Sequence, residues 1–204
     1  MTTSVGNRGT SYDDSVDSND PRKLKGLAHP LRLRILGLLR SVGPSTATRL
    51  AEQLGESSGS TSYHLRQLAT YGYIVPDEER EARGKERWWR PASRFTDLPR
   101  VEAREGHEGA EGFLRALAAD FSREMDDFVG TLHLLPEQWD EGWTLSDRFL
   151  RLTPDEASEL RIRLKEVIVG FRQNRIEGEL DAPQDARTVL VQLQILPKAA
   201  NPQS

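Results

Sequence analysis

Apolar residues recur at helical spacing in two short segments that follow one another in the N-terminal half of the chain. The first segment is 46–54, and its apolar positions fall on one face: Ala47, Leu50, Ala51 and Leu54. Gly55 follows, where a glycine commonly ends a helix. Ser57 or Ser58 can then cap a second helix that runs to about Tyr71. Its inward stripe consists of Thr61, Leu65 and Leu68. The pattern therefore predicts two short helices joined by a tight turn.

The outward face of the second predicted helix carries hydrogen-bonding side chains, one fixed cation and almost no carboxylate. Arginine and glutamine can form paired hydrogen bonds with base edges in a DNA major groove, and serine and tyrosine can reach phosphates and base edges. The candidate base-reading residues on this face and its flanks are Ser60, Ser62, Tyr63, His64, Arg66 and Gln67. The alternative is an ordinary amphipathic helix pair whose polar face is solvated.

A charged hairpin is predicted directly after the helix pair. Residues 73–76 and 87–90 are short runs that favour β-strands, and the segment 77–85 between them is charged and contains a glycine. Helix, turn, helix and hairpin is the order of elements in a winged helix. The cations that this wing could present to a phosphate backbone are Arg80, Arg83, Lys85 and Arg87. Acidic residues in the same hairpin cancel much of this charge, so not all of these cations can be phosphate ligands.

Several stretches between residues 20 and 91 resemble the ArsR-type winged-helix transcriptional regulators of bacteria. They are DPRKLKGLAHPLRLRILGLL, ATRLAEQLG, TSYHLRQLATYGYIV and the GKERWW hairpin. The resemblance covers less than half of the chain and implies a homodimeric DNA-binding protein whose second helix of the pair enters the major groove. Metal sensors of this family often carry cysteine thiolates on the first helix of the pair, and this chain has no cysteine. Metal sensing by that route is excluded. Histidine and carboxylate ligands remain open, but nothing in the sequence indicates them, so we expect no metal site.

The chain before the helix pair divides into a tail and an interrupted helix. Residues 1–19 have few apolar side chains and cannot bury enough surface to offset the entropy of ordering, so they predict a disordered tail. Asp20 can cap a first helix with Pro21 at its first position. His29 and Pro30 break and restart this helix, and we expect His29 to cap it rather than to bind a ligand.

The longest periodic segment is 111–134, after a polar stretch at 92–110 that we expect to be a linker. Its apolar residues form a heptad-like seam of about 36 Å: Leu114, Leu117, Phe121, Met125, Phe128 and Leu132. Such a helix can pack on its own domain or cross a two-fold mate, and the two roles are compatible. We expect the first five of these residues, together with the helix at 22–28, to form a dimer interface.

The last third of the chain is predicted to be a small α/β unit. Residues 143–152 alternate enough to be a strand, and 188–196 form the clearest strand pattern in the chain. Between them, Thr153 and Glu156 form a capping box at the start of a helix. Two strands and a helix are too little to be stable alone, so they should pack on the long helix.

These segments predict a mainly helical α+β fold. Its parts are a winged helix-turn-helix domain at 20–91, a long dimerisation helix with the small α/β unit at 111–198, and a short tail at 199–204.

Charge is distributed unevenly along the chain, whose formal net charge is −4. Residues 21–91 hold 13 basic and 7 acidic residues, a net of +6, whereas residues 92–204 hold 14 and 21, a net of −7. The excess of positive charge therefore lies in the segment that the motifs had indicated independently, and this local charge is the relevant quantity for DNA binding.

Other functional classes find less support. The sequence has no nucleophile elbow, HExxH motif, phosphate-binding loop or cysteine nucleophile, so we expect neither an enzyme nor a cofactor. It has no signal-peptide pattern and no apolar run long enough for a membrane helix, which favours the cytoplasm. Two alternatives stay open: a regulator whose C-terminal part binds a small molecule near Trp139, Trp143 and Phe149, and a winged-helix module that binds a protein instead of DNA.

Overall fold

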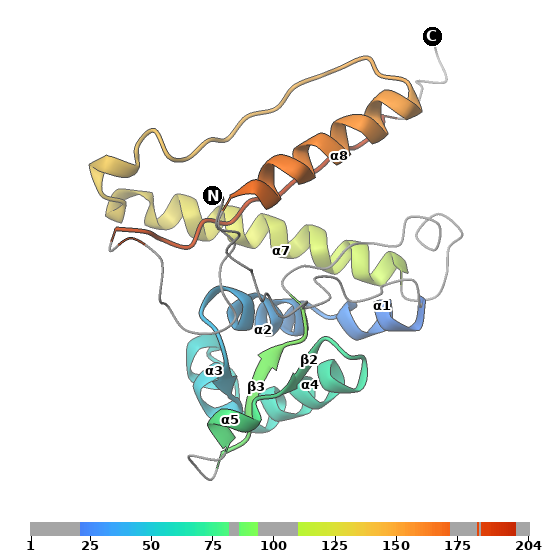
Figure 1. Cartoon of the computed structure of the whole chain (residues 1–204). Coiled ribbons are helices and arrows are strands. Elements are labelled where there is room, and N and C mark those ends of the chain that lie inside the picture. The colour runs from blue at the N-terminus through green and yellow to red at the C-terminus, as the bar shows by residue number, and fades with distance from the viewer. Residues whose placement is uncertain (1–20, 82–85, 94–109, 172–182, 184, 199–204) are drawn as a thin grey trace, which may run out of the picture. The chain divides into compact units, whose positions relative to one another are not determined.

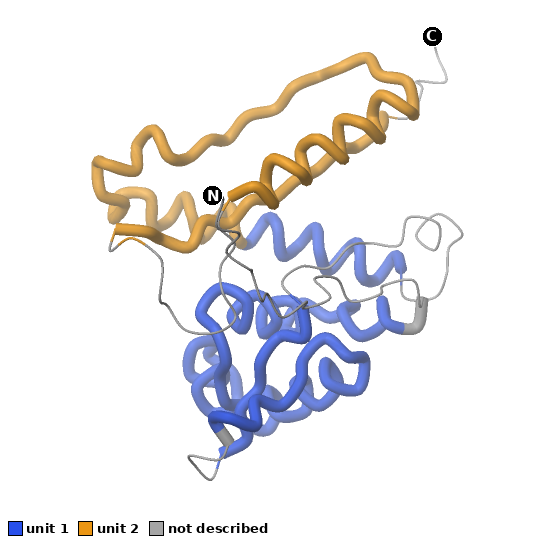
Figure 2. The backbone as a smooth tube through the Cα atoms, in the orientation of Figure 1, with its two compact units in different colours: residues 1–123, 175–182 blue, residues 124–174, 183–204 orange. Residues whose placement is uncertain are grey.

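The computed structural model describes residues 21–81, 86–93, 110–171, 183 and 185–198 (Figure 1). The chain divides into two compact units, coloured blue and orange in Figure 2. The first comprises residues 1–123 and 175–182, and the second comprises 124–174 and 183–204. The chain is mainly helical with one small sheet, as the sequence predicts. Among the described residues, no helix is long and apolar enough to cross a membrane.

The core of the first unit is built by leucine-rich helices at the N-terminal end. α1 spans Pro21–Leu27 and α2 spans Pro30–Ser41. His29 separates them and caps α2, because its Nδ1 atom accepts a hydrogen bond from the Leu31 backbone N–H at 3.2 Å. The predicted capping role of His29 is therefore confirmed. The most deeply buried side chains of these two helices include Leu24, Leu27, Ile35, Leu36 and Leu39.

The predicted helix pair is present with the predicted caps. α3 spans Ala47–Leu54 and α4 spans Ser58–Thr70. Gly55 ends α3 in the left-handed conformation (φ 67°), which glycine adopts without steric cost. Leu50, Leu65 and Leu68 are fully buried and hold the two helices on the core.

The first unit also contains a three-stranded antiparallel sheet with the order β1-β3-β2. β2 spans Ile74–Pro76 and β3 spans Trp88–Pro91, so the predicted hairpin strands are confirmed. β1, Ser45–Thr46, was not predicted, and it pairs with β3 directly before α3 begins. A short helix, α5 (Glu78–Glu81), occupies part of the segment that the sequence predicted as a turn.

Tyr73 connects the hairpin to the helices. Its side chain is fully buried, and its hydroxyl donates a hydrogen bond to the Lys23 carbonyl oxygen of α1 at 3.0 Å. Burial raises the pKa of Tyr73 to about 12, although the neighbouring cation of Arg40 acts in the opposite direction. Arg40 of α2 donates hydrogen bonds to the Ser93 carbonyl and hydroxyl oxygens at 3.1 and 3.4 Å. These contacts link both ends of the hairpin to α1 and α2.

The long helix α7 spans Ala110–Thr131 and is followed by a 3₁₀ turn at Leu132–Leu134. Its first turns pack on the core of the first unit through Ala110, Phe113 and Ala116. These residues are not the predicted seam, of which only Leu117 joins that core as a partly buried neighbour. The helix therefore uses two faces, one that packs on its own domain and one that carries the seam.

The second unit contains the remaining part of α7, a second 3₁₀ turn at Glu137–Trp139 and the helix α8 (Pro154–Gly170). The capping box at the start of α8 is confirmed, because Thr153 and Glu156 exchange hydrogen bonds between side chain and backbone. The strands expected over 143–152 and 188–196 are wrong for the single chain, since neither segment is assigned to a strand. An isolated extended segment lacks the neighbouring backbone that a ladder needs, and the described residues of this part of the chain supply no such neighbour.

Several predictions fall on residues that the structure does not describe. They concern the tail at 1–19, most of the linker at 92–110, the wing cations Arg83 and Lys85, and the tail at 199–204.

Candidate nucleic-acid interface

α4 is oriented by contacts at both of its ends. At its start, the Ser57 hydroxyl oxygen accepts a hydrogen bond from the Ser60 backbone N–H at 3.1 Å. At its end, the backbone N–H of Tyr73 donates to the Leu68 carbonyl oxygen at 2.9 Å. Gly26 of α1 lies against Tyr71, where an added Cβ would come within 2.6 Å of the tyrosine ring. The position of α4 is therefore fixed relative to α1 and the hairpin.

The candidate residues of α4 differ in exposure. Tyr63 and Arg66 are exposed, and Ser60, Ser62 and Gln67 are half-buried. The Arg66 Nε donates a hydrogen bond to the Ser62 carbonyl oxygen at 3.2 Å, which holds the guanidinium over the preceding turn of the helix. The exposed face of α4 thus combines a cation, a phenol, hydroxyls and an amide.

His64 lies on the inner side of α4, with only 8% of its surface exposed. Its ring centroid is 4.4 Å from that of His29, and the edge of the Tyr63 ring packs against it at 5.1 Å. Burial, the neighbouring His29 and the cation of Arg32 lower the pKa of His64, so the neutral ring is favoured. In this position the His64 ring contributes to packing on the buried side of α4. The spacing could have indicated this, because His64 precedes the buried Leu68 by one helical turn.

Two hairpin arginines lie over tryptophan rings. The guanidinium of Arg80 is 5.4 Å from the centroid of Trp88, and that of Arg87 is 4.5 Å from the centroid of Trp89. Arg80 also pairs with Asp77 at 3.2 Å, which neutralises part of its charge. Arg49 of α3, which the sequence reading missed, lies over Trp88 at 4.8 Å. The tryptophans of β3 therefore position cations that come from two different elements.

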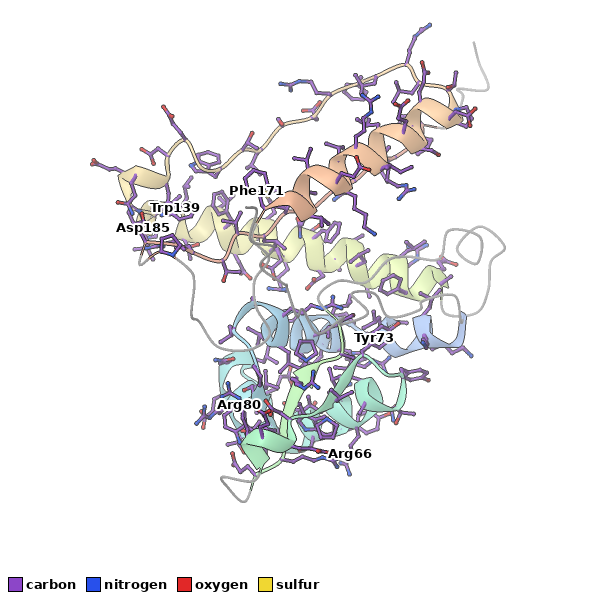
Figure 3. All side chains as sticks on the ribbon, in the orientation of Figure 1. Arg66, Tyr73, Arg80, Trp139, Phe171 and Asp185 are labelled. Carbon is purple, nitrogen blue, oxygen red and sulfur yellow. The ribbon has the colours of Figure 1, made fainter. Side chains whose placement is uncertain are left out.

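A hollow of about 420 Å³ lies where α3, α4 and the hairpin meet. Its lining residues come from these three elements and from the end of β1: Thr46, Ala47, Thr48, Ser62, Arg66, Glu86, Arg87 and Trp89. The Thr48 hydroxyl donates a hydrogen bond to the Glu86 carboxylate at 3.2 Å across it. The hollow brings the predicted base-reading Arg66 and the predicted wing cation Arg87 to one surface. Figure 3 shows Arg66 and Arg80 toward the same end of the first unit, and Tyr73 away from that end.

The other candidate residues lie on α7 and in the second unit. Leu114 and Met125 are each 39% exposed, and the remaining three predicted dimerisation residues are half-buried: Leu117, Phe121 and Phe128. The Phe128 ring lies 5.5 Å from the Trp143 ring, whereas Phe149 is 83% exposed. The described residues contain no group of three or more potential metal ligands.

Residues 27–72 match the family model of a helix-turn-helix domain. The matched segment begins at the end of α1 and ends directly after α4, so it contains the complete helix pair. The match supports a helix-turn-helix DNA-binding domain in this chain. No curated protein matches the chain.

Proposed function

We propose that this protein is a homodimeric transcriptional regulator of the ArsR winged-helix type, which reads a specific DNA sequence through α4. The helix-turn-helix match supports DNA binding at the level of the domain. The observation that carries the finer proposal is the shared hollow, because α4 and the hairpin contribute cations to the same surface.

Base reading is assigned to the exposed face of α4. Arg66 can donate two parallel hydrogen bonds to a guanine, and Gln67 can pair with an adenine edge. Tyr63, Ser60 and Ser62 are suited to phosphates and base edges. His64 is left out of this group because its burial keeps the ring away from the exposed face.

Phosphate contacts are assigned to the cations that the tryptophans position. Arg87 borders the hollow, and Arg49 lies over Trp88, so both can reach a backbone beside α4. Arg80 is a weaker phosphate ligand because Asp77 already pairs with it. Such contacts fix the orientation of a protein on the duplex and make its affinity depend on salt.

Dimerisation is assigned to the seam on α7. Two-fold symmetric helix-turn-helix proteins read two half-sites about one helical turn apart, so a regulator of this kind needs a self-complementary interface. The seam suits this role because Leu114 and Met125 keep more than a third of their surface exposed while another face of α7 packs on the core.

The test is fluorescence anisotropy of the full chain with duplexes from upstream of its own gene, beside a scrambled duplex of equal composition. We expect one duplex to bind at least about 10³-fold more tightly than the scrambled one. We also expect a steep loss of affinity as the salt concentration rises, since phosphate contacts release counterions. Equal, weak binding to all duplexes would contradict sequence-specific DNA recognition.

Complete absence of DNA binding would favour a winged helix that binds another protein. Binding that appears only after a small molecule is added would instead assign an effector role to the C-terminal half. Tryptophan fluorescence with a metabolite panel would report such a ligand through Trp139 or Trp143.

A further inference from the structure

The described residues of the second unit form no core of their own. Among residues 124–171, 183 and 185–198, not one side chain is buried. The first unit, in contrast, contains a contiguous cluster of fully buried leucines. A segment of this size that adopts one conformation needs buried apolar surface to offset its loss of entropy.

The second unit exposes large apolar side chains along most of its length. They include Phe149 at 83%, Phe171 at 73%, Leu134 at 69%, Leu196 at 66% and Leu190 at 61%. Val189 and Val191 are exposed at 55% and 58%. Single exposed apolar residues are ordinary, but soluble monomers rarely expose contiguous apolar patches beyond a few hundred Å². This many large exposed apolar side chains within one unit indicate an interface.

The segment 188–196 has the strongest strand pattern in the chain and yet belongs to no sheet that the described residues form. Its sequence, TVLVQLQIL, contains no charged residue. Two copies that lie side by side therefore bring no like charges opposite one another, which is the arrangement that destabilises strand pairs. An antiparallel pair about a two-fold axis lets each copy supply the ladder that the other lacks.

Charge along α8 also fits a second copy of the same helix. Its first half carries carboxylates at Asp155, Glu156 and Glu159, and its second half carries three cations, Arg161, Arg163 and Lys165, beside one carboxylate, Glu166. Arg163 also pairs with Glu159 of its own helix. In an antiparallel pair of such helices, the acidic half of one copy faces the basic part of the other.

We propose that a second copy of this chain completes the second unit, and that the segment 188–196 pairs with its own two-fold mate as an antiparallel strand. The exposed side chains of 143–152 and α8 then become the core of a shared unit. This inference rests on the proposed homodimer and adds a second surface, beside the seam on α7, that the homodimer needs. It also explains why the sequence predicts strands that the single chain does not form.

The first test measures the molar mass of the full chain by light scattering after gel filtration. We expect twice the 23.0 kDa of one chain for the wild type. Val191→Lys should return the mass to that of one chain, because it would bury an unpaired charge in the apolar surface that the two copies share. Gln138→Lys adds the same charge at an exposed polar position and should leave the mass unchanged. A monomeric wild type, or a dimeric Val191→Lys variant, would overturn the inference.

The second test uses the absence of native cysteine, because each single-cysteine variant then holds one thiol. Cysteine is placed in turn at 190, 191, 192 and 193, and mild oxidation is followed on non-reducing gels. In a two-fold antiparallel pair only the residue nearest the axis lies opposite its own copy. Strand pairing therefore predicts a disulfide-linked dimer at one of these positions and little cross-linking at the others. Gln138→Cys serves as the control for random collision. A dimer that never cross-links through 190–193 would overturn the strand pairing while leaving the proposed function intact.

The anisotropy assay separates the two proposals. The Val191→Lys variant should keep weak binding to a single half-site, since the first unit is unchanged. Loss of dimerisation with retained half-site binding supports both proposals. If the dimer forms and no duplex is bound, the proposed function fails and the shared unit stands.

Discussion

Tyr73→Phe should change the pH dependence of stability in a way that can be calculated from the structure. At neutral pH the substitution removes the hydrogen bond to the Lys23 carbonyl, which costs about 0.5–1.5 kcal/mol. The pKa of Tyr73 is raised to about 12 from the ordinary value of 10.0, because burial disfavours the phenolate. The raised pKa contributes stability that is fully present below pH 10. This contribution is lost as pH rises toward 12, because the phenol ionises more readily in the unfolded chain than in the folded one.

The expected loss follows from the difference between the two pKa values. At pH 11.5 the unfolded chain ionises this tyrosine and the folded chain largely does not, which lowers the free energy of unfolding by about 2 kcal/mol. The Tyr73→Phe variant has no phenol to ionise, so its free energy of unfolding does not fall in this way at high pH. The variant should therefore be less stable than the wild type at pH 8 and more stable at pH 11.5, with a crossing between about pH 10 and 11.

The assay is denaturant unfolding at pH 8, 10, 11 and 11.5, monitored by circular dichroism. Tyr73 and Arg40 each affect the pKa of the other, so the comparison reports on this pair together. Tyr63→Phe is the matched control, because Tyr63 is 54% exposed and its curve should follow that of the wild type. If Tyr73→Phe and the wild type stay parallel up to pH 11.5, the buried, un-ionised state of Tyr73 is refuted.

Three further changes test the interface and its support. Glu86→Gln should tighten binding to every duplex several-fold in anisotropy at low salt, because a carboxylate in the hollow repels phosphate; unchanged affinity would put Glu86 outside the DNA path. Burial lowers the pKa of both His29 and His64, so stability should fall as pH drops from 7 toward 5. His64→Gln should flatten that decline in thermal unfolding, whereas an equal decline in the variant would assign it to other groups. Ser57→Ala should lower stability by about 1 kcal/mol through loss of the α4 cap, Ser57→Asp should restore it, and equal melting temperatures for all three proteins would show that the cap contributes nothing.

The sequence predicted most of what depends on local chemistry. The caps at His29, Gly55, Ser57 and Thr153 all stand where the residue types indicated, because each acts on backbone groups within a few positions of itself. The helix pair followed from those caps and from the apolar spacing, and the hairpin strands followed from runs of β-favouring residues.

The features that the sequence did not predict depend on distant partners. β1 exists because Ser45 and Thr46 meet β3, more than forty positions away, and no local pattern indicates that meeting. The prediction of a strand at 188–196 was wrong for the opposite reason, since its pattern is strong but the residues that the structure describes offer it no partner strand. Arg49 entered the candidate interface only through Trp88, which comes from another element.

The measurement that tests the central claim most directly is the ratio of affinities for a selected and a scrambled duplex, compared between the wild type and Arg66→Ala. Arg115→Ala removes another exposed arginine, on α7, and serves as the control. If α4 reads bases, Arg66→Ala should lower the ratio by a factor that corresponds to about 1–3 kcal/mol of binding free energy. Arg115→Ala should leave the ratio unchanged. An equal loss of affinity for both duplexes would mean that Arg66 contacts only the backbone, and no loss at all would remove the exposed face of α4 from the DNA interface.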